Sequence, residues 1–402
     1  MIEGTRFPCR FRGYPVLLVF FIFFAFKFSQ ESRMLQKALV LVFVLASIAG
    51  CISCGSTSSH YVYATIPVAN QIIAYREDPN SGVLTQISGS PYTVGEGAIS
   101  LVLHPSKKFL YVANPGQGGT QENDISLFTI ASDGTLTEVL PRASVAPLAS
   151  QPHLLLMDPA GAFLYVLNAG SSNISVFSID STKGTLTQLQ PPNSPVSTGA
   201  LPLNMQLTPS GNFLYVSLAS QPNGLIETFS VTGGQLTPLG TTSTDGMNPY
   251  GLAINASGNY LYVANSGPSN SIAVFPIASS GLLSAQVQGS PIANGYTNPI
   301  AMIFDPSGNY LYVADQGSSN VAAYSITSTG LPAALTTSTT TNAFGTESSP
   351  SFLVADPTGK YLFVGNQGTG AGIQAFGVSS GSLNALTTYS VGNTPSSIAV
   401  LQ

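Results

Sequence analysis

The chain has 402 residues, of which 44% are hydrophobic and only 7% are charged, and its formal net charge at pH 7 is −5. The hydrophobic share excludes a disordered chain. With 12 Lys and Arg against 17 Asp and Glu, the chain cannot supply the basic stripe that nucleic-acid phosphates require, so no nucleic-acid partner is expected. The 40 Gly and 28 Pro are typical of a turn-rich all-β protein.

The N-terminal region has the pattern of an export signal followed by an anchor. Residues 34–50 contain one Lys, an apolar run and then small residues, which is the order of a secretory signal peptide. The tetrapeptide IAGC (48–51) resembles the bacterial lipobox, which implies cleavage before Cys51 and acylation of its thiol. Residues 51–59, rich in Ser, Thr and Gly, are then a flexible tether. The alternative is an ordinary signal peptide in which Cys51 is incidental.

A second apolar run, residues 15–26, precedes this signal and is too short to predict a membrane-spanning helix. We expect residues 1–33 to be an overextended start, with Met34 as the initiator; an extra membrane-inserted segment is the alternative. A lipid anchor at Cys51 would make the membrane a partner of the protein. The expected location is the periplasmic side of a bacterial cell envelope, with the outer membrane preferred because Ile52 stands where inner-membrane retention uses Asp.

An internal repeat covers the rest of the chain. An aromatic-rich block recurs with a period of about fifty residues, which is typical of β-propellers. Its seven copies are YVYAT (61–65), FLYVAN (109–114), FLYVLN (163–168), FLYVSL (213–218), YLYVAN (260–265), YLYVAD (310–315) and YLFVGN (361–366). Each unit also holds an apolar run opened by Pro, an alternating run with an Ile-x-x-aromatic core, and a Leu-Thr-x-Leu run. Residues 60–402 are therefore predicted to form a seven-bladed β-propeller with four antiparallel strands per blade.

The two ends of the repeat region complement each other. The first unit begins at His60 with its second strand, whereas residues 395–402 form a first strand and nothing more. The C-terminal strand is therefore predicted to complete the first blade, which removes the open sheet edges that invite aggregation. No cysteine follows Cys54, so the stability of this domain must come from packing and closure of the ring.

With its Tyr-Val-x-Asn blocks, DPxG turns and fifty-residue period, the region 60–402 resembles the lactonase-like seven-bladed propellers, the YVTN-repeat group that includes 6-phosphogluconolactonase. The resemblance implies the propeller fold and makes lactone hydrolysis, without a cofactor, a candidate activity. Where the family's enzymes carry Pro-His-x-His, this chain has PHLL (152–155), which keeps His153 and replaces the second histidine by leucine.

Other functional positions implied by the resemblance are not retained. The segment aligned with the family's Asp-Leu-Gly-x-Asp reads NAGSSN (168–173), the counterpart of Pro-Arg-His ends at Asn204, and the counterpart of Asn-Glu is Leu218 and Ala219. The arginine, the glutamate and both aspartates are thus missing. Lactone hydrolysis needs a base and an oxyanion stabiliser, and a phosphorylated lactone also needs cationic side chains.

Propeller ligands bind where the innermost strands begin, at the mouth of the central channel. The residues that follow the opening proline, or align with such residues, are Ala98, His153, Leu203, Tyr250, Ile300, Ser351 and Ser396. Among them and their neighbours, His153 is the candidate catalytic base, and Tyr250, Asn204 and Ser351 are candidate ligand-binding residues. For His153 and Tyr250 the alternative is a purely structural role.

No metal site is expected from the sequence. Asp158, Asp305 and Asp356 occupy the same turn of different blades, so they are predicted to be turn formers that lie apart around the ring. No motif predicts nucleotide, serine or thiol chemistry.

Two functions remain open at this point. One is a non-catalytic envelope propeller that binds a protein, glycan or peptide on its face, and the other is a lactone hydrolase with His153 as base. The possible partners at the channel mouth are an envelope protein, a glycan or a small lactone. A hydrolase predicts a concave pocket in which His153 has a polar partner, whereas a scaffold predicts a broad face with His153 packed. A long segment near residues 140–150 could form a lid or a binding loop.

Overall fold

The computed structural model of the protein describes residues 60–401, except 118, 120, 121, 192, 336–341 and 369. The predicted overextended start (1–33), the signal peptide (34–50), and Cys51 with its tether (51–59) lie outside the described residues. Within the described part, no helix is long and apolar enough to cross a bilayer.

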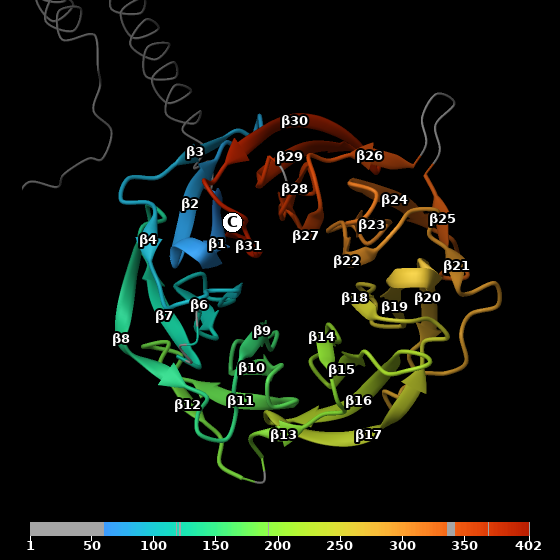
Figure 1. The fold of residues 1–402 in the computed structure, drawn as a ribbon, viewed down its shortest axis with the longest axis horizontal. Coiled ribbons are helices and arrows are strands. Elements are labelled where there is room, and N and C mark those ends of the chain that lie inside the picture. The colour runs from blue at the N-terminus through green and yellow to red at the C-terminus, as the bar shows by residue number, and fades with distance from the viewer. Residues whose placement is uncertain are drawn as a thin grey trace, which may run out of the picture. The chain divides into compact units, whose positions relative to one another are not determined.

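The described residues form seven antiparallel sheets arranged as blades around a ring (Figure 1). Blades two to four contain β5 (Ser100–Leu103), β6 (Phe109–Asn114), β7 (Asp124–Ile130) and β8 (Leu136–Ser144); β9 (Pro152–Met157), β10 (Phe163–Asn168), β11 (Asn173–Ile179), β12 (Leu186–Gln188) and β13 (Val196–Ser197); and β14 (Pro202–Leu207), β15 (Phe213–Leu218), β16 (Leu225–Thr232) and β17 (Gln235–Ser243). Blades five to seven contain β18 (Pro249–Ile254), β19 (Tyr260–Asn265), the 3-10 helix η3 (Gly267–Ser269), β20 (Ser271–Pro276) and β21 (Ile292–Ala293); β22 (Pro299–Phe304), β23 (Tyr310–Asp315), β24 (Asn320–Ile326), β25 (Pro332–Ala334) and β26 (Ala343–Gly345); and β27 (Pro350–Ala355), β28 (Tyr361–Asn366), β29 (Gly372–Ser379) and β30 (Ser382–Ser390).

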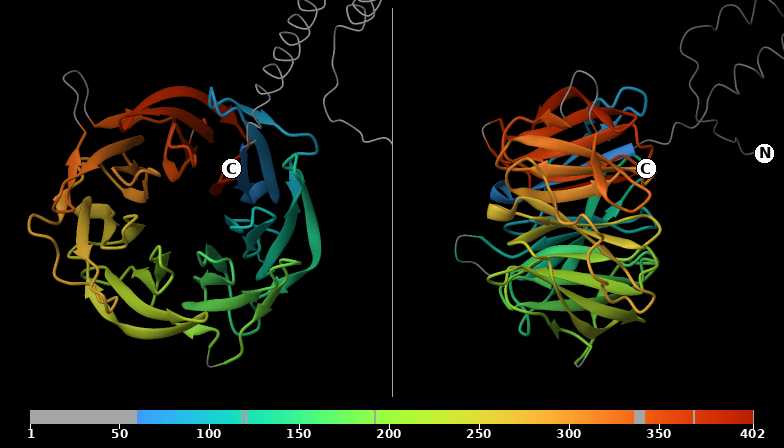
Figure 2. Two further views of the ribbon diagram at one scale, coloured as in Figure 1. Left: turned by 180° about the vertical axis from the view of Figure 1, so that it is seen from behind. Right: turned by 90° about the vertical axis from the view of Figure 1, so that its right-hand side faces the viewer.

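The first blade joins both ends of the propeller. It contains β1 (His60–Ile66), the 3-10 helix η2 (Pro67–Ala69), β2 (Gln71–Glu77), β3 (Leu84–Gln86), β4 (Tyr92–Thr93) and the C-terminal strand β31 (Ser397–Leu401). Strand β31 pairs antiparallel with β1 from Thr65↔Ser397 to Tyr61↔Leu401. Figure 1 shows blue β1 beside red β31, and Figure 2 shows the ring from behind and from the side. The predicted seven-bladed fold and its closure by the C-terminal strand are confirmed.

Each blade packs on the next through a repeated aromatic–glycine contact. The first aromatic residue of each second strand covers a left-handed glycine in the outer turn of the following blade, as Phe213 covers Gly281 (φ +84°). Tyr361 of blade seven covers Gly82 of blade one, so the contact closes around the ring. Glycine is required because a side chain at this position would occupy the space of the aromatic ring, and because a positive φ disfavours other residues.

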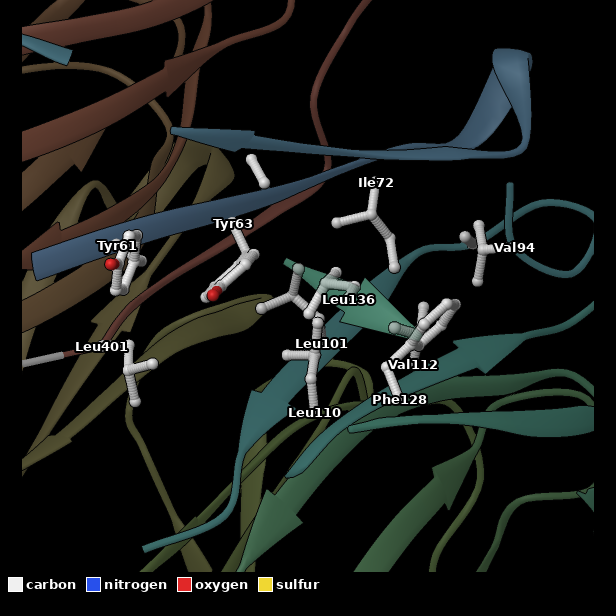
Figure 3. Packing of buried hydrophobic residues seen from close by; sticks show 12 residues of the cluster. Tyr61, Tyr63, Ile72, Val94, Leu101, Leu110, Val112, Phe128, Leu136 and Leu401 are labelled. Atoms are coloured by element: carbon white, nitrogen blue, oxygen red, sulfur yellow. The ribbon is translucent and has the colours of Figure 1, made fainter. Parts of the chain in front are cut away.

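The hydrophobic core is divided among the seven junctions between blades. At the first junction, Tyr63 and Ile72 of blade one meet Leu110 and Phe128 of blade two (Figure 3). The Tyr63 hydroxyl donates to the carbonyl oxygen of Gly134 at 2.9 Å, which satisfies the polar end of a fully buried ring. Alternating strand residues therefore face neighbouring blades on both sides, as the period-two pattern predicts.

The segment near residues 140–150, for which a lid or a binding loop was left open, is part of a strand in its first five residues. Strand β8 runs through Ser144 as the outer strand of blade two, paired with β7. Its Arg142 is held by Glu138 at 2.8 Å and Glu122 at 3.2 Å. The sequence showed a long unit, but it did not reveal that residues 140–144 belong to an outer strand as long as β17 and β30.

Candidate functional site

The mouth of the channel is built by the same backbone device in successive blades. The residue before the opening proline has a positive φ, as at Asn248 (48°) and Asn298 (53°). Its carbonyl oxygen accepts a hydrogen bond from the residue that follows the aromatic block, which for Asn298 is the N–H of Gln316 at 2.9 Å. The geometry recurs in several blades, so it reflects the repeat, and it turns one side chain per blade toward the channel.

These side chains line a cavity of about 660 Å³ at the start of the inner strands. Of the seven positions predicted to meet there, His153, Leu203, Tyr250, Ile300, Ser351 and Ser396 do line it. Ala98 does not: its side chain is fully buried, and Ile99 and Ser100 take its place. The volume is within the range of small-molecule sites.

His153 lies on the cavity wall at the start of β9. Its ring is exposed to the cavity, yet the surrounding channel walls desolvate it, and this burial lowers its pKa. Across the described residues, its imidazole has no hydrogen-bond or ion-pair partner. The ring is therefore a neutral group that can accept or donate one hydrogen bond but lacks the carboxylate that orients a catalytic histidine.

The other predicted residues differ in how many of their hydrogen-bonding groups remain free to contact a ligand. Asn204 is fixed by donating from Nδ2 to the carbonyl oxygen of Tyr250 at 2.8 Å and by accepting from the N–H of Met205 at 2.8 Å. The Ser351 hydroxyl donates to the carbonyl oxygen of Gly365 at 3.2 Å. Tyr250 is 41% exposed, and its hydroxyl has no partner among the described residues. Asn204 thus links two inner strands, whereas Tyr250 presents a free hydroxyl and a ring face.

Sequence reasoning missed a set of amide side chains at the same mouth. They are Asn248, Asn298, Gln316 and Gln367. Two precede the opening proline and two follow the aromatic block, so the repeat register contained the signal that would have found them.

The electrostatics of the cavity are those of a neutral polar site. Its lining consists of amides, hydroxyls, one tyrosine, one histidine and aliphatic groups, and it includes no Asp, Glu, Lys or Arg within the described part of the chain. The buried Asn side chains at the ends of the aromatic blocks do not contribute. Asn168, for example, is fully buried and bonds to Asn173 and Ser175 of its own blade.

Fold and cavity together define a closed propeller with a small-molecule-sized site at its mouth. Residues 54–198, 201–296 and 252–343 match the lactonase family of 7-bladed β-propellers, and the chain belongs to this family. The resemblance seen in the repeats is confirmed.

Individual relatives match a shorter part of the chain than the family as a whole does. The chain is 34% identical over 122 residues to the 6-phosphogluconolactonase of Sodalis glossinidius and 33% identical over 122 residues to that of Cronobacter sakazakii. Each match covers 30% of this chain and 32% of the relative, so the chain spans about a third of the length of the curated relatives it matches.

Solved structures share the fold over most of the propeller. A Bacteroides fragilis protein provisionally named a 6-phosphogluconolactonase superposes with a TM-score of 0.71 at 18% identity, over 87% of this chain and 99% of its own. The periplasmic gluconolactonase of Pseudomonas aeruginosa gives a TM-score of 0.55 at 23% identity, over 70% and 78%. At these identities the comparison concerns the fold alone.

Proposed function

We propose that the channel mouth binds a neutral, hydroxyl-rich small molecule, a sugar or a sugar lactone, as a binding propeller without catalytic turnover. The single observation that carries this proposal is the cavity lining, in which amides and hydroxyls converge without an ionised side chain. Amides and hydroxyls donate to and accept from sugar hydroxyls, and the face of Tyr250 offers a flat apolar surface.

A phosphorylated ligand fits this cavity poorly. Recognition of a phosphate group requires Arg or Lys or a set of backbone N–H groups, since a dianion loses a large hydration energy on binding. The lining described here offers no cation. We therefore propose that the ligand of this protein differs from the phosphorylated lactone that its relatives' name implies.

Binding is tested by calorimetry of the full chain with glucose, glucono-δ-lactone, gluconate and 6-phosphogluconate. We expect the neutral compounds to bind and the phosphorylated one to bind at least tenfold more weakly. Gln316→Ala should weaken binding by about 1 kcal/mol, the net value of one hydrogen bond. Gln235→Ala, at an exposed outer-strand position, is the matched control and should leave binding unchanged. Tighter binding of the phosphorylated compound would contradict the proposal.

Lactone hydrolysis is the second candidate function, and the position of His153 favours it. The pKa of the ring is lowered, so the imidazole is neutral near pH 7 and able to take a proton from an attacking water. The amides of Asn248 and Gln316 could donate to the developing oxyanion. The missing partner of His153 argues against it, because an unoriented base gives little rate enhancement.

Hydrolysis is tested separately with a panel of uncharged sugar and aliphatic lactones. Turnover by the wild type that His153→Ala abolishes, while calorimetry still shows binding, would make the protein an enzyme. Equal background rates for the two proteins would leave the binding propeller as the function.

For the location of the protein, we propose a lipid anchor at Cys51 on the periplasmic side of a bacterial envelope, so that the propeller works tethered to a membrane. The support is the IAGC tetrapeptide after an apolar run. Metabolic labelling with a radioactive fatty acid should mark the wild type and leave Cys51→Ser unlabelled. Cys54→Ser is the matched control and should stay labelled. Absence of label from the wild type would contradict the anchor.

A further inference from the structure

The seam where the ring closes carries a group of buried ionisable side chains. His60, Glu77 and Asp356 come from β1, the end of β2 and the turn between β27 and β28. One nitrogen or oxygen atom of each lies within 4.8 Å of those of the other two, and none of the three residues is more than 1% exposed. His60 pairs with Glu77 at one end of β1, next to the Tyr61↔Leu401 pair, whereas Ser397, at the mouth, faces Thr65 near the other end of β1. The group therefore lies at the end of the blade away from the cavity.

Glu77 is exceptional when the blades are compared with one another. Glu77 pairs with His60, the residue just before the aromatic block of its blade. In every other blade, the equivalent residue is the one whose N–H donates to the carbonyl oxygen of the residue just before the block. These equivalents are Ile130, Ile179, Val231, Ile277, Ile326 and Val378. Blade one therefore carries a carboxylate where the repeat carries a branched aliphatic side chain. Substituting Glu for Ile or Val at a buried site is costly unless the charge is compensated.

The described residues do not compensate that charge fully. The Oε2 atom of Glu77 lies 3.5 Å from His60 Nδ1, but Oε1 has no hydrogen-bond partner in this part of the chain. Burial, and after it the charges of Asp356 and Asp78, raise the pKa of Glu77 to about 8. One oxygen of this buried carboxylate thus has no partner among the described residues, and the carboxylate lies beside a histidine and a second carboxylate.

Asp356 is already oriented as a ligand would be. Its Oδ1 accepts the N–H of Tyr361 at 2.8 Å, and its Oδ2 accepts the N–H of Thr358 at 3.0 Å and the Thr358 hydroxyl. Asp305 makes similar turn bonds but is half-buried, whereas Asp356 is 0% exposed because blade one covers it. Hydrogen bonds of this kind fix a metal-binding carboxylate in place.

The place of the group follows from the topology. At the other junctions the DPxG-type turns of neighbouring blades pack on each other, as Gly211 does on Pro159 and Gly359 on Pro306. Blade one has no such turn, because its first strand is β31 and its second is β1, at opposite ends of the chain. The side chains of His60 and Glu77 face Asp356 where the missing turn would lie.

We propose that His60, Glu77 and Asp356 bind one structural divalent transition-metal ion of the zinc type, which fastens the first blade to the last. A nitrogen ligand favours zinc over calcium or magnesium, and two carboxylates neutralise the charge of the ion. Zinc bonds of about 2.0–2.2 Å place neighbouring ligand atoms roughly 3.3–3.6 Å apart, a spacing that the His60–Glu77 pair at 3.5 Å already meets. The ligand atoms that are farthest apart lie within 4.8 Å of each other, so they must approach by about 1 Å when the ion binds. The three side chains would fill three positions of a tetrahedral ion, and the second oxygen of a carboxylate or a water would fill the fourth. Because all three residues are buried, that position is closed to a substrate.

The test is refolding, since a sealed site takes up its ion as the protein folds. The full chain is unfolded, refolded with or without zinc chloride, gel-filtered and analysed for metal by mass spectrometry. We expect one zinc per chain, and a Tm at least about 5 °C above that of protein refolded with a chelator.

Variants separate the site from adventitious binding. Glu77→Ile restores the residue type of the other blades, so it should fold, and it should retain no zinc. Asp356→Asn should also lose the ion, whereas Asp305→Asn, the same turn position one blade earlier, should keep it. A wild type that refolds without retaining zinc, or zinc retained equally by Glu77→Ile, would overturn the proposal and leave a buried ion-pair cluster.

Discussion

The clearest stability prediction concerns Asp315, the last residue of β23. Its side chain is fully buried, and burial raises its pKa to about 8, against a smaller opposing effect of the hydrogen bond from Asn294. Four other blades carry Asn at this position, namely Asn114, Asn168, Asn265 and Asn366. We expect Asp315→Asn to stabilise the protein, by an amount that grows with pH.

The hydrogen bonds at the equivalent position of another blade give the reason. In blade three, Asn168 Nδ2 donates to Asn173 Oδ1 at 2.9 Å. In blade six the corresponding atoms, Asp315 Oδ2 and Asn320 Oδ1, have no hydrogen-bond partner among the described residues. Both are acceptors when Asp315 is ionised, so only a protonated Asp or an Asn can bridge them.

The sign of the pH dependence follows from the raised pKa. An unfolded Asp titrates near 3.9, so between about pH 4 and pH 8 the folded protein binds one more proton than the unfolded chain. This contribution to stability is fully present below pH 4 and is lost as pH rises through 8. At about 1.4 kcal/mol per pH unit, the wild type should lose roughly 3–4 kcal/mol between pH 5 and pH 8. Asp315→Asn avoids this loss.

Urea unfolding at pH 5, 6, 7 and 8 measures the difference between the two proteins, in which all other titrating groups cancel. Asn265→Asp, which places a carboxylate at the equivalent site of blade five, is the reverse control and should lose stability as pH rises. A difference between Asp315→Asn and wild type that stays constant from pH 5 to pH 8 would refute the reasoning.

Two further predictions concern closure of the ring. Gly281→Ala should cost about 2–4 kcal/mol, since an added Cβ would lie 2.1 Å from the Phe213 ring in a left-handed backbone. Gly295→Ala shares the positive φ (+80°) but has nothing within 4 Å of the added Cβ, so it should cost only about 1–2 kcal/mol; equal urea midpoints for the two variants would contradict the packing argument. Deleting residues 396–402 should remove strand β31, whose Ile398 and Leu401 are at least nine-tenths buried. The free energy of unfolding should fall by about 3–6 kcal/mol or more. The deletion should also expose the edge of β1 to intermolecular pairing; an unchanged Tm and a monomeric gel-filtration profile would contradict closure by this strand.

The sequence alone determined the repeat and its strands. Aromatic blocks such as FLYVAN (109–114) coincide with strands such as β6. They could be predicted because a strand depends on the residue types within it and on the turn residues that flank it, all within a few positions. The incomplete first and last units predicted the closure. The same register placed His153, Tyr250, Asn204 and Ser351 at one mouth, although it did not identify Gln316 or Gln367.

Only the tertiary structure decided what surrounds these residues. The opening-proline pattern could not show that His153 lacks a partner or that the cavity holds no charge, because its walls come from all seven blades. Glu77 and Asp356 are far apart in sequence and meet because the last blade packs against the first. Local periodicity specifies strands and their order, whereas contacts across the closing seam depend on how the complete ring packs.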